Sequence, residues 1–143
     1  MPYDPRFVQP MREELTQAGF QELKTAADVD KFLAQTSGTA MIVVNSVCGC
    51  AAGAARPGVT QAIKGAIKPD RIATVFAGQD LEAVDRARFH FTNIPPSSPA
   101  IALFKEGKLV HFVHRHNIEG RDAAGLAADL TKAFEKHCAT VTK

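Results

Sequence analysis

Residues 39–55 read TAMIVVNSVCGCAAGAA, which is an apolar run, then two cysteines one residue apart, then an alanine-rich segment. This pattern predicts a strand, a short loop and a helix, with Cys48 and Cys50 at the junction. The N-terminus of a helix carries partial positive charge and unpaired N–H donors, and both stabilise a thiolate, the reactive form of cysteine. Two thiols in this place therefore indicate redox chemistry or a metal site.

The sequence on either side of this stretch predicts alternating helices and strands. Asp4-Pro5 is a typical helix start, and Thr25 followed by Asp28 resembles a capping box. Asp80 can cap a further short helix. We expect helices at residues 5–19, 25–38, 80–88 and 122–138, a helix interrupted by Pro57 after the cysteines, and strands at about residues 20–23, 39–45, 71–77, 100–104 and 109–114.

The order of these elements decides the fold class. Helices between the early strands imply right-handed crossovers and parallel pairing, and the turn at residues 105–108 adds an antiparallel hairpin. We expect an α/β fold in which a mixed central sheet carries helices on both faces, formed by residues 1–143 as a single domain. The apolar helix faces give the candidate core: Phe7, Val8, Met11, Leu15, Val29, Phe32, Leu33, Val59, Ala62, Ile63, Ala66, Leu126, Leu130 and Phe134.

Composition and charge narrow the class of protein. The chain is 45% hydrophobic and 22% charged, as an ordinary globular domain is, and its formal net charge of +2 comes from interspersed residues. Without a basic cluster we expect no nucleic-acid partner, and the apolar runs are too short to cross a membrane. Residues 1–6 lack a signal-peptide pattern, so we expect a cytoplasmic protein. Three cysteines are too few for a disulfide-stapled secreted domain, and close thiols in a reducing compartment are typically catalytic or metal-binding.

Five stretches of the chain carry a resemblance to a known family. PAIALFKEGKLV at residues 99–110 is similar to the cis-proline strand and hairpin of thioredoxins. Four others closely resemble the bacilliredoxin family: VNSVCGCA at residues 44–51, TVFAGQD at residues 74–80, PPSSP at residues 95–99 and RHNIEG at residues 115–120. The resemblance covers nearly the whole chain. It implies a thioredoxin-like three-layer fold, a central mixed β-sheet flanked by helices, with an extra N-terminal helix.

The resemblance also implies a thiol–disulfide oxidoreductase with a CxC active site and no bound cofactor or metal. Bacilliredoxins are associated with removing bacillithiol from protein mixed disulfides and with disulfide isomerase activity. Carried over to this chain, Cys48 is the attacking cysteine and Cys50 is its partner. Bacillithiol or a similar low-molecular-weight thiol would be the co-substrate. The implied partners are client proteins that carry mixed disulfides, and a recycling reductase or thiol pool, for a monomer or weak homodimer.

Three more residues are expected to contact the substrate. Gly49 permits an unusual backbone conformation between the thiols. The thioredoxin resemblance implies a cis peptide at Ser98-Pro99, and proline presents no N–H that would compete for the nearby sulfur. The backbone of Ser98 can then pair with an extended client peptide, which is a short form of strand addition.

Four other residues have two interpretations each. Asn45 and Ser46 can hydrogen-bond in the loop, and we expect turn stabilisers rather than catalysts. Arg56 can attract a thiolate or an anionic small thiol, but a surface or capping arginine beside Pro57 is the interpretation we favour. Cys138 lies on an apolar helix face, where free cysteine behaves as a small hydrophobe, and a resolving role or an intermolecular disulfide is the alternative.

Two other functions stay open at this point. A metal-binding or metal-delivery protein would hold Zn²⁺ or Cu(I) on the CxC thiols, with Cys138 or a histidine completing the shell. His111, His114 and His116 alternate along the last strand, which is more typical of a strand surface than of a ligand set. A scaffold domain that merely keeps the fold is the third hypothesis, and the intact cysteine pair argues against it.

Overall fold

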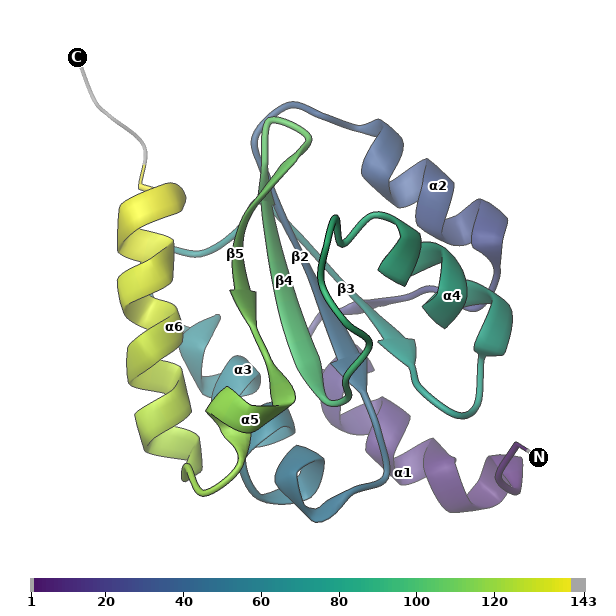
Figure 1. Cartoon of the computed structure of the whole chain (residues 1–143). Helices are drawn as coiled ribbons and strands as arrows, with labels where there is room; N and C mark the ends of the chain where they lie inside the picture. The colour runs from purple at the N-terminus through teal and green to yellow at the C-terminus, as the bar shows by residue number, and fades with distance from the viewer. Residues whose placement is uncertain (1, 140–143) are drawn as a thin grey trace.

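In the computed structural model, which describes residues 2–139, five strands form one sheet with helices on both faces (Figure 1). The helices are α1 (Pro5–Thr16), α2 (Ala26–Ala34), the π-helical turn η1 (Ala51–Ala55), α3 (Arg56–Ala62), α4 (Leu81–Phe89), α5 (Arg115–Ile118) and α6 (Ala123–His137). The strands are β1 (Gln21–Glu22), β2 (Thr39–Asn45), β3 (Arg71–Phe76), β4 (Ala100–Lys105) and β5 (Lys108–Val113). In the described part of the chain, no helix is long and apolar enough to cross a membrane.

The sheet has the strand order β1-β3-β2-β4-β5. β1, β3 and β2 run parallel, whereas β4 is antiparallel to both β2 and β5. The mixed sheet, the parallel pairing of the early strands and the terminal hairpin are therefore confirmed. β2 is the central strand and all seven of its residues are buried, which explains the almost continuous apolar run in the sequence.

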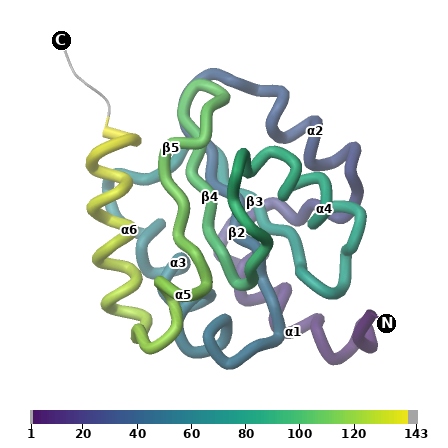
Figure 2. Tube along the Cα trace, viewed as in Figure 1, coloured from purple at the N-terminus to yellow at the C-terminus, as the bar shows by residue number. Residues whose placement is uncertain are grey.

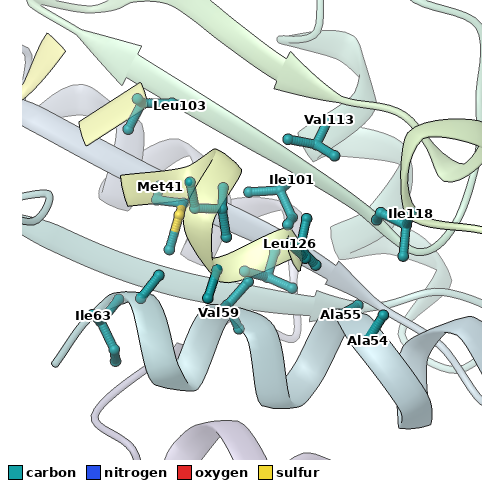
Figure 3. Close-up of a cluster of buried hydrophobic side chains, with 14 of the residues drawn as sticks. Met41, Ala54, Ala55, Val59, Ile63, Ile101, Leu103, Val113, Ile118 and Leu126 are labelled. Atoms are coloured by element: carbon teal, nitrogen blue, oxygen red, sulfur yellow. The ribbon is translucent and has the colours of Figure 1, made fainter. Parts of the chain in front are cut away.

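Alternate residues of β2 divide the core into two layers. Met41 and Val43 face a cluster that α1, α3 and α6 complete, and Figure 3 shows Met41 among side chains of these last two helices. Ala40, Ile42 and Val44 face the opposite cluster, which α2 and α4 cover. Figure 2 follows the same arrangement as a tube, with α3 and α6 on one side of the strands and α2 and α4 on the other.

The helix after the cysteines starts with a π-turn rather than with a simple kink. Pro57 has no N–H, and in a regular α-helix its ring would clash with the carbonyl of Gly53, four residues earlier. The chain avoids this clash by widening, because the Arg56 N–H donates to the carbonyl of Ala51, five residues back. The additional residue in this turn sets the face of the helix on which Arg56 lies.

Three expectations about single residues were wrong. Phe7 was expected in the core but is 55% exposed, because it lies on the solvent side of α1, where its ring centroid is 6.0 Å from that of Tyr3. Ala66 is exposed because α3 ends four residues before it. Asp80 makes no capping hydrogen bond, since its carboxylate instead accepts two from Arg12, at 2.7 and 3.0 Å.

The four-residue α5 has no counterpart among the expected elements, because one turn is too short to show a helical period. It is closed by a capping box in which the His114 N–H donates to Asn117 Oδ1 at 3.0 Å. The other expected elements are present with small differences at their ends. α2 differs most, since it ends at Ala34 rather than near Gly38.

Candidate active site

Cys48 and Cys50 lie where the central strand passes into the helix that follows it. β2 ends at Asn45, and the Cys48 carbonyl accepts hydrogen bonds from the N–H groups of Ala51 and Ala52, at 3.0 and 3.2 Å. Helical geometry thus begins directly after Cys48, as the strand-loop-helix pattern predicted. Both thiols are free and half-buried.

The two thiols have unequal acidity. Burial pushes the pKa of Cys48 upward, but hydrogen bonds from the Ser46 side chain, the Ala51 N–H and Cys50 together outweigh it and leave this pKa below the usual thiol value. Burial and the hydrogen bond with Cys48 both raise the pKa of Cys50. As pH rises, the pair therefore loses its first proton mainly from Cys48, which becomes the thiolate. Cys50 remains a thiol that can donate to it.

The expectation that Arg56 is a surface or capping arginine was wrong. Arg56 is 2% exposed, because the π-turn directs it beneath the loop that carries the cysteines. Its Nη1 donates to Asn45 Oδ1 at 3.0 Å and to the Ser46 carbonyl at 2.7 Å. Its Nε lies 3.1 Å from Glu14 Oε1 on α1, in an ion pair whose N–H is not aligned for a hydrogen bond.

Asn45 and Ser46 connect Arg56 to Cys48. Asn45 Oδ1 also accepts from the Ser46 N–H at 2.9 Å, and Asn45 Nδ2 donates to the Met11 carbonyl at 3.1 Å. The Ser46 hydroxyl accepts from the Cys48 N–H at 3.3 Å. Both residues stabilise the turn, as expected, and in doing so they determine where the Ser46 hydroxyl lies relative to the thiol.

The Ser98-Pro99 peptide is cis, as the thioredoxin resemblance implied. β4 begins at the next residue, Ala100, which pairs with Val44 near the end of β2. Continuing this antiparallel register places Pro99 and Ser98 beside the loop that carries the cysteines. Pro99 is buried there, and Ser98 is half-buried.

Two arginines donate to the carbonyl group of the cis peptide and to the one before it. Arg88 Nη2 donates to the Ser97 carbonyl at 3.4 Å, and Arg115 Nη1 donates to the Ser98 carbonyl at 3.1 Å. The backbone of Ser98 was expected to pair with a client peptide, and its carbonyl already has a donor within the protein. The sequence indicated neither arginine as a site residue, although Arg115 lies in the RHNIEG stretch of the family resemblance.

A cleft of about 440 Å³ opens beside Cys50. Gly49 and Gly53 line one side of it, and Ile118 and Glu119, at the end of α5, line the other. A larger cavity of about 710 Å³ lies between α1 and α3, and no cysteine lines it. Of these two spaces, the smaller cleft is therefore the one that a cysteine of the CxC pair lines.

Cys138 lies away from this site. It packs against the core cluster beneath α6, and a hydrogen bond with Thr39 places it near the start of β2, whereas Cys48 follows the other end of that strand. Burial raises the pKa of Cys138. The structure thus does not bring this thiol to the CxC pair, and its packing is that of a small apolar side chain.

The histidines form pairs rather than a ligand cluster. His114 and His116 stack with ring centroids 5.0 Å apart, and the His111 ring centroid lies 6.3 Å from that of His137. Within residues 2–139, no group of three His, Cys, Asp or Glu side chains is placed to hold a metal ion.

The sequence of this chain is similar to those of known proteins. Residues 3–138 match a family model described as disulphide isomerase. A bacilliredoxin of Koribacter versatilis is 57% identical over 129 residues, which cover 90% of this chain and 89% of that protein. A bacilliredoxin of Bacillus licheniformis is 53% identical over 137 residues, which cover 95% of each chain.

Solved structures confirm the thioredoxin-like fold. The thioredoxin of Fasciola hepatica aligns with a TM-score of 0.58 at 21% identity, covering 82% of this chain and 99% of that one. The N21Q mutant thioredoxin of Halobacterium salinarum aligns with a TM-score of 0.59 at 14% identity, covering 87% and 96%. The fold and the CxC pair thus agree with the sequence matches. The chain belongs to the bacilliredoxin family, whose model is described as disulphide isomerase, and it is a thiol–disulfide oxidoreductase.

Proposed function

We propose that this oxidoreductase removes a low-molecular-weight thiol, bacillithiol or a similar one, from mixed disulfides on client proteins. The unequal acidity of the two thiols carries the proposal, because it leaves Cys48 as the thiolate and Cys50 as its protonated neighbour. The identity shared with bacilliredoxins supports the choice of substrate.

Cys48 is the attacking residue in this mechanism. Its thiolate attacks the sulfur of the small thiol, a new S–S bond forms on Cys48, and the mixed disulfide breaks as the client sulfur leaves as a thiolate. Cys50 then loses its proton and attacks the Cys48 sulfur, which releases the small thiol and leaves a Cys48–Cys50 disulfide. Two electrons from a recycling reductase or a thiol pool restore both thiols.

In this mechanism Gly49, Ser98 and Pro99 contact the bound disulfide. Gly49 separates the two thiols and lines the cleft beside Cys50. Pro99 offers no N–H that competes for sulfur, and the Ser98 N–H and hydroxyl meet the client, because Arg115 holds the carbonyl. We place the reaction in the cytoplasm, where a reducing thiol pool supplies the electrons.

Disulfide isomerisation is a second candidate, favoured by the description of the matching family model. It uses the same first step, with a protein disulfide in place of the mixed disulfide. A second client thiolate then attacks the sulfur that is joined to Cys48, so a new client disulfide forms and the Cys48 thiolate returns. This cycle consumes no electrons.

Transfer of bacillithiol to a Cys50→Ala variant tests the proposal. The reduced variant is incubated with a bacillithiol-modified client, and intact masses are measured for both proteins. We expect one bacillithiol on the variant and a free thiol on the client, whereas the matched Cys48→Ala variant should gain no bacillithiol. A client that stays modified beside reduced Cys50→Ala protein would refute dethiolation. Faster refolding of a client with scrambled disulfides would then support isomerisation.

A further inference from the structure

Both carbonyl groups of Ser97 and Ser98, beside the cis proline, already have donors within the protein. Strand addition uses free carbonyl groups as well as free N–H groups along an edge. Arg88 and Arg115 already donate to the carbonyls of Ser97 and Ser98, at 3.4 and 3.1 Å. What this side of the site exposes instead is the guanidinium group of Arg115, whose side chain is 44% exposed.

Arg115 is held from three directions without using all of its donors. Its backbone N–H donates to Ser97 Oγ at 3.4 Å, its Nη1 donates to the Ser98 carbonyl, and its Nε lies 3.7 Å from Glu119 Oε2. A guanidinium group has five N–H donors in a fixed planar fork. Because the Glu119 contact is long and both side chains are well exposed, it is weak, and it leaves donors available to a ligand.

Arg115 also lies beside the active site, because its Nη1 donates to the carbonyl of Ser98, which the strand register places next to the loop that carries the cysteines. After burial and the neighbouring thiol, the next influences on the pKa of Cys50 are the Arg115 charge, which lowers it, and the Glu119 charge, which raises it. Glu119 lines the cleft beside Cys50. Arg121 lines the same cleft, but its Nη1 is 2.7 Å from Asp129 Oδ2, in a close ion pair. Of these two cations, Arg115 is therefore the one with donors to spare.

We propose that Arg115 is a specificity-determining residue that binds a carboxylate of the small thiol while that thiol is joined to Cys48. The inference rests on the proposed dethiolation and narrows its substrates to mixed disulfides of thiols that carry a carboxylate. The planar fork donates two parallel N–H groups to a carboxylate, a geometry that a neutral hydroxyl or an ammonium group does not match. Glu119 acts in the opposite sense, because it repels a carboxylate and attracts an amine.

Three mixed disulfides of one single-cysteine peptide test this selection. They are made with 3-mercaptopropionate, which is anionic, with 2-mercaptoethanol, which is neutral, and with cysteamine, which is cationic. The reduced full-length protein is mixed with each, and the rate of peptide-thiol release is measured. The anionic-to-cationic rate ratio is compared between variants, so that the intrinsic reactivity of each disulfide cancels.

Arg115→Ala should lower this ratio by about three- to fivefold, the upper part of the range for exposed ion pairs, and Glu119→Gln should raise it. Arg121→Ala removes a neighbouring positive charge, one that lines the cleft beside Cys50, and is the matched control, which should keep the ratio within about twofold. An unchanged ratio in Arg115→Ala, or an equal fall in Arg121→Ala, would overturn the inference while leaving dethiolation intact. A wild-type protein that releases no peptide from any of the three disulfides would overturn both.

Discussion

Replacing Arg56 with methionine should destabilise the protein and also raise the pKa of its reactive thiol, Cys48. Methionine roughly keeps the length of the side chain, so the change removes a charge and its donors without opening a large cavity. Asn45 Oδ1 keeps its hydrogen bond from the Ser46 N–H, but the Ser46 carbonyl loses the Arg56 donor. The Glu14 side chain is 47% exposed, so water can solvate the carboxylate that remains.

The size of the destabilisation follows from the hydrogen bonds that are lost. A hydrogen bond from a charged donor contributes about 1.5–3 kcal/mol, and a buried acceptor without a partner costs about 1–3 kcal/mol. These figures partly describe the same loss, so we expect the free energy of unfolding to fall by about 2–4 kcal/mol. The entropy of unfolding for 143 residues is about 0.3 kcal/mol/K, so the melting temperature should fall by about 7–13 °C.

The same substitution frees the loop that carries Cys48. Without Arg56, the Ser46 carbonyl is no longer held, and the Ser46 hydroxyl loses its set position beside the thiol. We expect the pKa of Cys48 to rise towards the usual thiol value. The rate of iodoacetamide alkylation against pH, measured in a Cys50→Ala background, reports that pKa. Circular dichroism reports the melting temperature.

Arg71→Met is the matched control. Arg71 also donates to two carbonyls, those of Phe32 and Ser37, each at 3.0 Å, and it lies at the start of β3, far from the end of β2 that carries the cysteines. This control should lower the melting temperature and leave the pKa of Cys48 unchanged. The reasoning is refuted if Arg56→Met melts within about 2 °C of the wild type, or if it leaves the pKa of Cys48 where Arg71→Met leaves it.

Three smaller changes test other parts of the structure. Ser46→Ala should raise the pKa of Cys48. Because only the thiolate reacts and its fraction at neutral pH falls as the pKa rises, alkylation at neutral pH should slow several-fold while the rate at high pH stays the same. Burial raises the pKa of Cys138, so a short iodoacetamide pulse at neutral pH should label Cys48 first, as peptide masses will show. Gly58→Ala places a Cβ 2.9 Å from a side-chain carbon of Leu126 and should lower the free energy of unfolding in urea by about 1–3 kcal/mol.

Each of these changes has its own control or contrary outcome. Ser37→Ala, at an exposed position before β2, should leave the pH profile of alkylation unchanged. Gly53→Ala adds a Cβ with no heavy atom within 4 Å, and because alanine favours a helix over glycine, it should not lower the free energy of unfolding. Three outcomes would contradict the contacts on which these predictions rest. They are earlier labelling of Cys138, an unshifted pH profile of alkylation in Ser46→Ala, and wild-type stability in Gly58→Ala.

Local patterns predicted the parts of the fold that depend on neighbouring residues. The strand β2 has the expected bounds, because an apolar run of this length needs burial on both faces. The capping box of Thr25 and Asp28 is present, since its hydrogen bonds join residues three apart. The same local reasoning located Cys48 and Cys50 at a helix start. The cis peptide at Ser98, in contrast, followed from the family resemblance rather than from any local pattern.

The remaining features depend on contacts between distant segments. Arg56 was expected at the surface, where charged residues usually lie, and its burial requires Asn45 from the end of β2 and Glu14 from α1. Asp80 has a strong capping propensity, yet Arg12, 68 residues earlier in the chain, binds its carboxylate. Neither contact leaves a local pattern, so sequence periodicity and propensity did not predict them.

The π-turn makes the number of residues between Cys50 and Arg56 matter as well as their identity. α3 is anchored on α6 where Gly58 meets Leu126, so a shortened segment cannot shift at that end. Each helical residue contributes a rotation of about 100° and a rise of about 1.5 Å. Deleting one residue from η1 would therefore turn the thiols away from the Ser46 hydroxyl. The segment thus acts as a spacer of fixed length, and its buried alanines, Ala51, Ala54 and Ala55, also pack in the core.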